Sequence, residues 1–270
     1  MTEIVHKELS YAVTGCIFDV HNAVGPGVRE ESYQKGLEVR LGEAELGFLA
    51  KPYTRRELIF LGEVADVFEP DLLIEDKLVV ELKAQKEGLT VANFRQVMNY
   101  LKFWNVRLGL LVNFAAHQAV VQRVLYQDQL VEPDEDYDFV RSVITPELRP
   151  LLKAIRDCIL SVHRCFGLGY NDTTYRQLIS IALRHHGCRC ESEQVVSPVY
   201  HGRELPRSPI TPLFVEGNVL IEVEAVHDNI NARAVRTMQT HLEMTKAALG
   251  LVVNFGKDRF QIRGVRPLKR

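Results

Sequence analysis

The sequence lacks the segments that mark membrane and secreted proteins. None of its apolar runs approaches the roughly 18 residues that a membrane-spanning helix needs. The N-terminal stretch MTEIVHKE has neither the basic region nor the apolar region of a secretory leader. A net charge of −2 also excludes the overall positive charge of proteins that coat nucleic acid. We therefore expect a cytoplasmic protein without membrane contact, in which any basic patch is local.

The sequence also lacks the cysteine spacing of disulfide frameworks and zinc sites. The number of cysteines, five, is odd, and Cys188 and Cys190 form a CxC pair rather than CxxC, with no second pair of ligands. We expect reduced thiols. No Walker loop, HExxH, GxSxG or dinucleotide fingerprint is present, which argues against ATPases, zinc proteases, serine hydrolases and Rossmann enzymes.

Helical and strand patterns alternate through the first 126 residues. Apolar positions at helical spacing predict a helix over residues 4–24 that stops at Gly25-Pro26-Gly27, and a second helix from Val28. Further patterns predict strands over 48–53, 57–61, 71–74, 78–83, 108–113 and 119–126, and a helix over 91–104. This order predicts an α/β (α+β-like) domain with a central mixed sheet of about four to five strands flanked by helices.

An acidic, proline-containing stretch separates this part from the rest of the chain. Residues 128–150 carry Asp and Glu in quick succession and end at Pro150, a composition typical of a linker. We therefore predict three parts: residues 1–127, a linker over 128–150, and residues 151–270.

The part after this stretch repeats the first. The helix stop VHNAVGPG (residues 20–27) returns as VHRCFGLG (162–169), 142 positions later. LVVELK (78–83) returns as VLIEVE (219–224), and GLLVNF (109–114) as GLVVNF (250–255), each 141 positions later. Because order and spacing agree across separate segments, the chain contains two tandem copies of one domain.

Charged residues stand among apolar ones in the predicted hairpin of residues 71–83. Side chains alternate along a strand, so Glu81 and Lys83 share one face and Leu82 points to the other. Asp71 on the neighbouring strand then lies beside Glu81. Two interpretations follow: a metal site, because buried carboxylates need a cation or a partner, or an edge hairpin with a solvated charged face.

The second copy helps to choose between these interpretations. It keeps the apolar strand residues and Glu222 in place of Glu81, but it has Pro212 in place of Asp71 and Glu224 in place of Lys83. Fold-stabilising residues are needed in both copies. The selective loss favours a chemical role in the first copy, although drift on a solvated face would leave the same pattern.

These residues carry a resemblance to a known family. Pro70-Asp71 followed by Glu81-Leu82-Lys83 resembles the signature of the PD-(D/E)xK nuclease superfamily. Gly27-x-x-Glu30-x-x-Tyr33, with the helix that bears Gln96, is similar to its GxxExxY branch. The resemblance implies two restriction-endonuclease-like domains: residues 1–127 with an intact motif, and 151–270 as a degenerate pseudo-nuclease.

The resemblance also implies roles for individual residues. A metal-dependent nuclease hydrolyses phosphodiester bonds with a divalent cation, here Mg²⁺ or Mn²⁺. Asp71, Glu81 and the carbonyl of Leu82 would be its ligands, and Lys83 would position the attacking water. Glu30 would be a further catalytic carboxylate; it equally suits a first-turn acid that answers the helix dipole.

Residues on the third helix would contact the substrate, which we expect to be nucleic acid and specifically DNA. These are Gln96, Tyr100 and Arg95. Arg95 belongs to a wider set of basic residues that scattered surface charge explains equally well: Arg55, Arg56, Lys86, Lys102 and Arg107.

Some motif residues persist in both copies, which favours a structural role. His21 matches His163, and Tyr33 matches Tyr175. We predict a structural role for the histidines, such as bonding the helix end, and we predict that the tyrosines pack with a satisfied hydroxyl.

A second hypothesis, from another functional class, is a non-catalytic module that binds nucleic acid or protein and retains the nuclease fold. For assembly, the tandem copy predicts an intramolecular pseudo-dimer, and hence a monomeric chain.

Overall fold

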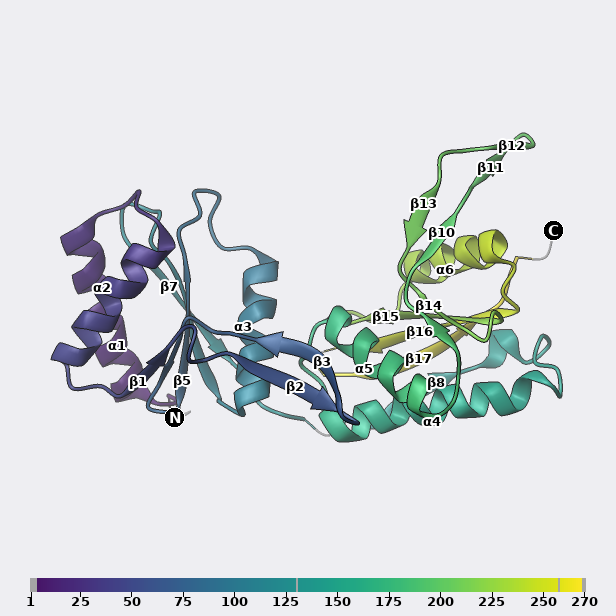
Figure 1. Cartoon of the computed structure of the whole chain (residues 1–270), viewed down its shortest axis with the longest axis horizontal. Coiled ribbons are helices and arrows are strands. Elements are labelled where there is room, and N and C mark those ends of the chain that lie inside the picture. The colour runs from purple at the N-terminus through teal and green to yellow at the C-terminus, as the bar shows by residue number, and fades with distance from the viewer. Residues whose placement is uncertain (1–3, 130, 257, 269–270) are drawn as a thin grey trace. The chain divides into compact units, whose positions relative to one another are not determined.

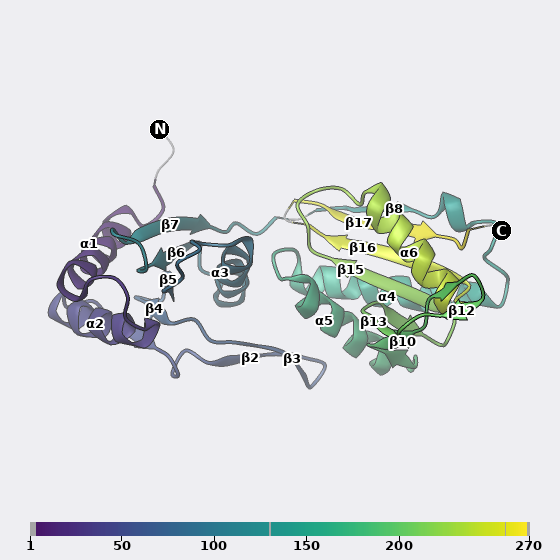
Figure 2. The same cartoon turned by 90° about the horizontal axis from the view of Figure 1, so that it is seen from above.

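In a computed structural model that describes residues 4–129, 131–256 and 258–268, the chain divides into two compact units. One comprises Met1–Leu58 and Asp66–Gln127, and the other comprises Ile59–Ala65 and Asp128–Arg270. Each unit is a mixed sheet with two helices on one face and one helix on the other (Figures 1 and 2). The described part of the chain contains no helix with the length and apolar character required to cross a membrane.

The first unit is built on a five-stranded sheet of order β1-β4-β5-β6-β7, in which only β5 and β6 run parallel. A separate two-stranded hairpin joins β2 and β3. The elements of the first copy are α1 (Lys7–Val24), α2 (Glu30–Glu43), β1 (Phe48–Ala50), β2 (Arg56–Phe60), β3 (Glu63–Phe68), β4 (Leu72–Ile74), β5 (Leu78–Lys83), α3 (Val91–Trp104), β6 (Leu108–Asn113) and β7 (Val120–Leu125); the tip of the β2–β3 hairpin, residues 59–65, groups with the second unit.

Strand β5 has different partners on its two faces. Leu78, Val80 and Leu82 are fully buried in a core that α1 and α2 complete with Ile17 and Leu37. Because side chains alternate, Glu81 and Lys83 face the side of the sheet that α3 covers. That helix lies very close to the sheet, since a Cβ on Gly109 of β6 would come within 2.6 Å of Val97. The fold therefore places two charged residues under α3.

The glycines after α1 fix the start of α2. Gly25 and Gly27 both have positive φ, at 74° and 97°, which a residue with a Cβ rarely adopts. Tyr33 donates its hydroxyl to the carbonyl of Gly25 at 2.7 Å and stacks on Phe114, fully buried. His21 contacts the carbonyl of Ala116, 95 residues along the chain, so its ring nitrogen joins two distant segments and does not bond the helix end.

The second unit repeats this plan on a six-stranded sheet of order β8-β17-β16-β15-β14-β9. Tyr175 again donates to the carbonyl of a helix-stop residue, Gly167, at 2.7 Å. The main elements are α4 (Leu148–Phe166), α5 (Asp172–His185), β9 (Cys190–Glu191), β14 (Leu213–Val215), β15 (Val219–Glu224), α6 (Ala232–Thr245), β16 (Leu249–Phe255) and β17 (Phe260–Val265). A projecting arm contains β10 (Gln194–Val196), β11 (Val199–Tyr200), β12 (Arg203–Glu204) and β13 (Ser208–Ile210).

The acidic stretch between the copies is more ordered than its composition suggests. It contains β8 (Pro133–Asp136), which runs parallel to β17, and a short 3₁₀ helix, η1 (Asp138–Val140). Asp134 pairs with Arg263 at 2.6 Å and Glu135 pairs with Arg156 at 2.6 Å. These ion pairs neutralise part of the acidic charge that made the stretch look like a linker. Strand β8 also brings the second sheet to six strands, rather than the four or five that we predicted.

One strand was not predicted, whereas the prediction about the cysteines is confirmed. Residues 63–68 form β3, which the sequence pattern did not predict, because only Ala65 and Phe68 of this strand are buried and charged residues interrupt its apolar pattern. All five cysteines are free thiols, as predicted.

Candidate active site

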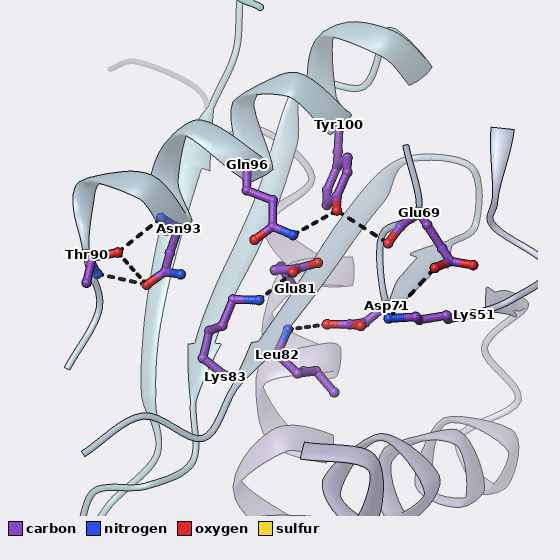
Figure 3. A network of polar contacts seen from close by, with 10 residues as sticks. All are labelled: Lys51, Glu69, Asp71, Glu81, Leu82, Lys83, Thr90, Asn93, Gln96 and Tyr100. Atoms are coloured by element: carbon purple, nitrogen blue, oxygen red, sulfur yellow. Dashed lines mark hydrogen bonds and ion pairs between the residues drawn. The ribbon is translucent and has the colours of Figure 1, made fainter. Parts of the chain in front are cut away.

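The first copy gathers two carboxylates at the hairpin of β4 and β5. Leu72 pairs with Val80 in antiparallel register, so the next residues outward, Asp71 and Glu81, lie opposite each other. Both side chains are buried, and Asp71 accepts a hydrogen bond from the backbone amide of Leu82 at 2.7 Å (Figure 3). Residues 75 and 76 close the hairpin with positive φ. The turn thus sets the register that brings the carboxylates together.

Lys83 occupies only one side of Glu81. Its ammonium lies 2.6 Å from Glu81 Oε1, with both side chains largely shielded from water. The other oxygen, Glu81 Oε2, is buried without a hydrogen-bond partner among the residues that the structure describes. A buried carboxylate oxygen without a partner is costly, because it loses water and gains nothing in exchange.

The pKa values of the two carboxyl groups also indicate that the site lacks positive charge. Burial, and then the neighbouring Asp71 carboxylate, raise the pKa of Glu81 to about 8 despite the adjacent Lys83. Burial also raises the pKa of Asp71, and the Leu82 amide and Lys83 offset only part of this effect. Burial opposes the charge of Lys83, but Glu81 keeps the pKa of its ammonium above the usual value. The site therefore has too little positive charge to keep both carboxylates ionised.

Two more charged residues act on this pair. Glu30, the first residue of α2, is half-buried; burial raises its pKa, while Lys83 lowers it and Asp71 raises it. Lys51 donates its backbone amide to the carbonyl of Asp71 at 3.0 Å, and its ammonium lowers the pKa of both Asp71 and Glu30. Lys51 also lies 3.8 Å from Glu69. Helix α2, and the residue that directly follows strand β1, thus contribute to the same site as the hairpin.

Helix α3 places polar side chains over the carboxylates. Gln96 donates to the hydroxyl of Tyr100 at 2.9 Å, and both lie on the side of α3 that faces Glu81 and Lys83 (Figure 3). Burial, followed by the charge of Glu81, raises the pKa of Tyr100, so its hydroxyl stays protonated at neutral pH. Arg95 is exposed on the same helix, and within the described ranges it makes no polar contact with this group.

The geometry fits a hard divalent cation. Two adjacent acids with raised pKa values and an orphaned oxygen supply ligand atoms that lack only positive charge. Over the described residues, no three His, Cys, Asp or Glu side chains form a group that could hold a metal ion. The cation would therefore need water, carbonyl or substrate oxygens as well, as Mg²⁺ commonly does.

The second copy has kept only one of the two acids of this site and has lost the lysine. Glu222 takes the place of Glu81, and burial followed by the charge of Glu224 raises its pKa to about 7. Burial and Asp172 raise the pKa of Glu224, which stands where the first copy has Lys83. Pro212 replaces the opposing aspartate. The first copy alone therefore combines a carboxylate pair with a lysine.

The sequence patterns missed Lys51 and Glu69. Neither stands in a motif, because Lys51 reaches the site through the pairing of β1 with β4, which joins segments more than 20 residues apart. The comparison of the two copies also points to Lys51, but only once this strand pairing is known. Leu49 pairs with Leu73 and Glu191 with Phe214, so the residue that corresponds to Lys51 is Glu193, another reversal of charge.

Comparisons with known proteins bear on the fold. A family model described as the PD-(D/E)XK nuclease superfamily matches residues 7–124 and again 149–266. No curated protein matches the chain significantly. The crystal structure of SSO0001 is similar at 15% identity and a TM-score of 0.31, covering 52% of this chain and 72% of that one.

Proposed function

We propose that this chain, which belongs to the PD-(D/E)XK nuclease superfamily, is a divalent-cation-dependent nuclease with one active site, in its first copy. The two matches of the family model agree with a tandem duplication. Its place in the GxxExxY branch, on the residues Gly27, Glu30 and Tyr33, is part of this proposal.

One observation carries the proposal. Asp71 and Glu81 are buried side by side with raised pKa values, and an oxygen of Glu81 has no partner within the described part of the chain. Such an arrangement is unfavourable for folding alone, since a buried carboxylate pair repels. It becomes favourable when a cation binds. Perturbed acids of this kind are typical of sites selected for chemistry rather than stability.

In this proposal, Asp71 and Glu81 hold Mg²⁺ or Mn²⁺, with the carbonyl of Leu82 as a further ligand. When bound, such an ion supplies Lewis-acid stabilisation of charge on phosphoryl oxygens and favours the deprotonation of water. The Leu82 amide holds the carboxylate of Asp71 in a fixed orientation, which keeps a ligand atom in place before the ion arrives.

Lys83 and Glu30 would act on the water and the phosphate. The ammonium of Lys83 is largely buried and stays charged beside Glu81, so it can orient a water molecule and offset negative charge on the phosphate. The half-buried carboxyl of Glu30 has a raised pKa, which makes it a better proton acceptor than an exposed glutamate. Gln96, Tyr100 and Arg95 on α3 would contact the substrate, which we expect to be DNA.

The second copy would have a structural or substrate-binding role. Glu222, Glu224 and Asp172 give the region equivalent to the active site a negative charge that repels a phosphate backbone, so any contact with substrate would come from another part of this copy. A single active site cuts one strand at a time. We therefore expect nicking or trimming rather than paired double-strand cuts.

A cleavage assay tests the proposal. End-labelled DNA with Mg²⁺ should be cut by the wild type, spared in the presence of EDTA, and spared by Lys83→Ala. Glu224→Ala changes the equivalent residue of the second copy and should cut as the wild type does. Equal cleavage by wild type and Lys83→Ala would contradict the proposal, and DNA binding without any cleavage would support the non-catalytic module instead.

A further inference from the structure

The backbone on both sides of Asp71 is held by the loop that joins β1 to β2. The amide of Lys51 donates to the carbonyl of Asp71 at 3.0 Å, one residue beyond the last pair of the β1–β4 ladder. The hydroxyl of Thr54 donates at 2.6 Å to the carbonyl of Pro70, the residue before Asp71. The two peptide groups that flank the Asp71 side chain are therefore both hydrogen-bonded to this loop.

These backbone contacts add to the one that the Asp71 side chain makes. Its carboxylate accepts a hydrogen bond from the amide of Leu82 at 2.7 Å, on the side away from the loop between β1 and β2 (Figure 3). Hydrogen bonds to the flanking peptide groups fix the position of the Cα, and the bond to Leu82 fixes the rotation of the side chain. The carboxylate thus keeps one orientation only while all of these bonds are present.

Thr54 is the buried residue of an otherwise exposed loop. It is 1% exposed, whereas residues 51–53 and 55 are all exposed. The loop is closed by a hydrogen bond of its own, from the amide of Tyr53 to the carbonyl of Ala50 at 2.8 Å. A hydroxyl at this depth is shielded from water and needs a partner inside the protein, which the Pro70 carbonyl supplies. Loss of the hydroxyl would leave this buried carbonyl without its donor.

The second copy separates the packing of this position from its hydroxyl. The pairings of β1 with β4 and of β9 with β14 align the two copies here at a displacement of 142, so Val196 stands in place of Thr54. Val196 is also buried, at 7% exposure. The same copy has Pro212 in place of Asp71. Burial of the position therefore persists without a hydroxyl, and the hydroxyl is found in the copy that has an aspartate to hold.

We propose that Thr54 is a positioning residue of the candidate active site, which holds the Asp71 carboxylate in place through the carbonyl of Pro70. Thr54 itself touches neither metal nor substrate. Without its hydroxyl, the peptide group before Asp71 turns towards another donor and carries the carboxylate with it. A shift of a fraction of an ångström weakens a site that has few ligands. Asp71 is a metal ligand only under the proposed function, so this role of Thr54 rests on that function.

The amide of Leu82 reports the position of the Asp71 carboxylate without metal or substrate. Nuclear magnetic resonance of the full-length chain in EDTA should show the Leu82 amide proton shifted upfield in Thr54→Val, because its hydrogen bond to the displaced carboxylate is weaker. Thr54→Ser keeps a hydroxyl and should return the resonance towards its wild-type position. This comparison separates the hydroxyl from the general effect of a substitution at a buried position.

Calorimetric titration with Mn²⁺ measures the consequence for the site. Thr54→Val should weaken Mn²⁺ binding by about tenfold, the lower end of the effect of residues that support a metal ligand, because the bonds from Lys51 and Leu82 remain. Thr54→Ser should bind nearly as the wild type does. A matched control is Thr14→Val, which removes a hydroxyl that donates at 2.6 Å to the carbonyl of Ser10 on α1. It should leave both the Leu82 resonance and the Mn²⁺ affinity unchanged.

Several outcomes would overturn this role of Thr54. They are an unshifted Leu82 resonance in Thr54→Val, a Mn²⁺ affinity of Thr54→Val equal to that of the wild type, and a loss of affinity that Thr14→Val shares. Absence of Mn²⁺ binding by the wild type would contradict the proposed function instead. The Leu82 resonance in EDTA would then still decide whether Thr54 holds Asp71, so the two failures are distinguishable.

Discussion

Glu81 and Lys83, two residues apart on β5, form an ion pair of 2.6 Å that satisfies one carboxylate oxygen and leaves the other without a partner in the described structure. Asp71 lies opposite and adds a second negative charge. The group therefore contains two acids and one nearby base. This excess of negative charge has measurable consequences for metal binding and for stability.

The first prediction concerns metal stoichiometry. Calorimetric titration with Mn²⁺ should show one site per chain, because only the first copy pairs two carboxylates across the hairpin. Asp71→Asn keeps the shape of the side chain but removes one ligand charge, and it should weaken binding by about tenfold to a hundredfold.

The matched control for this titration is Glu222→Gln in the second copy, which should bind Mn²⁺ as tightly as the wild type. Two sites per chain, or equal binding by wild type and Asp71→Asn, would contradict the prediction.

The second prediction concerns pH and stability without metal. The pKa of Glu81 is raised from its ordinary value of 4.5 to about 8 on folding, so the folded state binds this proton more tightly than the unfolded state. The free energy of unfolding should therefore fall as pH rises from about 4.5 to about 8. Glu81→Gln removes this titration, so the free energy of unfolding of the variant should fall less over the same pH range. The difference between the two falls should be on the order of 1–3 kcal/mol.

Chemical denaturation in EDTA at the two ends of this range measures the effect. Glu222, with a pKa raised to about 7, contributes a similar slope to both proteins, so it cancels in the comparison. Excess Mg²⁺ should restore stability at high pH in the wild type and not in Glu81→Gln. Parallel pH profiles for the two proteins in EDTA would contradict the prediction.

Much of the first unit follows from the sequence because its signals are local. Helix α3 was predicted at its observed bounds, residues 91–104, and Thr90 caps it through a reciprocal pair with Asn93. Strand β6 was also predicted at its observed bounds, since a fully buried strand reads as a continuous apolar run. The opposition of Asp71 and Glu81 follows from the short turn between their strands.

Other features escaped prediction because they depend on distant partners. Lys51 joins the site only through the pairing of β1 with β4, and no nearby residue announces that pairing. Asp134 lies in an acidic stretch whose composition is typical of a linker. Its charge is neutralised by Arg263, which lies on a strand far along the chain, so the local sequence gives no sign of the pairing. Local patterns thus give the elements, whereas non-local pairing decides which charged residues share an environment.

A third prediction concerns the tyrosines that follow the helix stops. Tyr33 and Tyr175 each donate a hydroxyl to a glycine carbonyl at 2.7 Å and stack on a phenylalanine. Removing one hydroxyl leaves a partly buried carbonyl without this donor, which costs about 1 kcal/mol. Tyr33→Phe should therefore lower the local stability of α1 and α2, and Tyr175→Phe that of α4 and α5.

Hydrogen exchange of the helix amides separates the two effects, because each variant serves as the control for the other unit. Loss of protection in both units from either single variant would contradict this account. Tyr175→Phe should also leave DNA cleavage unchanged, since it lies outside the copy that bears the candidate site.

The last prediction concerns Lys51 and the binding of substrate. Its ammonium lowers the pKa of both Asp71 and Glu30, and it is partly exposed beside Glu69, so it can also reach a phosphate that approaches the site. Lys51→Ala should raise KM for DNA by about tenfold while changing kcat less, because a phosphate contact mainly contributes uniform binding. It should also reduce the slope of log affinity against log salt by about one, the value for a single lost phosphate contact. Lys77→Ala removes an exposed lysine from the turn at the opposite end of β5 and should leave both quantities unchanged. If Lys51→Ala lowered kcat with KM and the salt slope intact, Lys51 would instead act by tuning the carboxylates, and the assignment to substrate binding would be wrong.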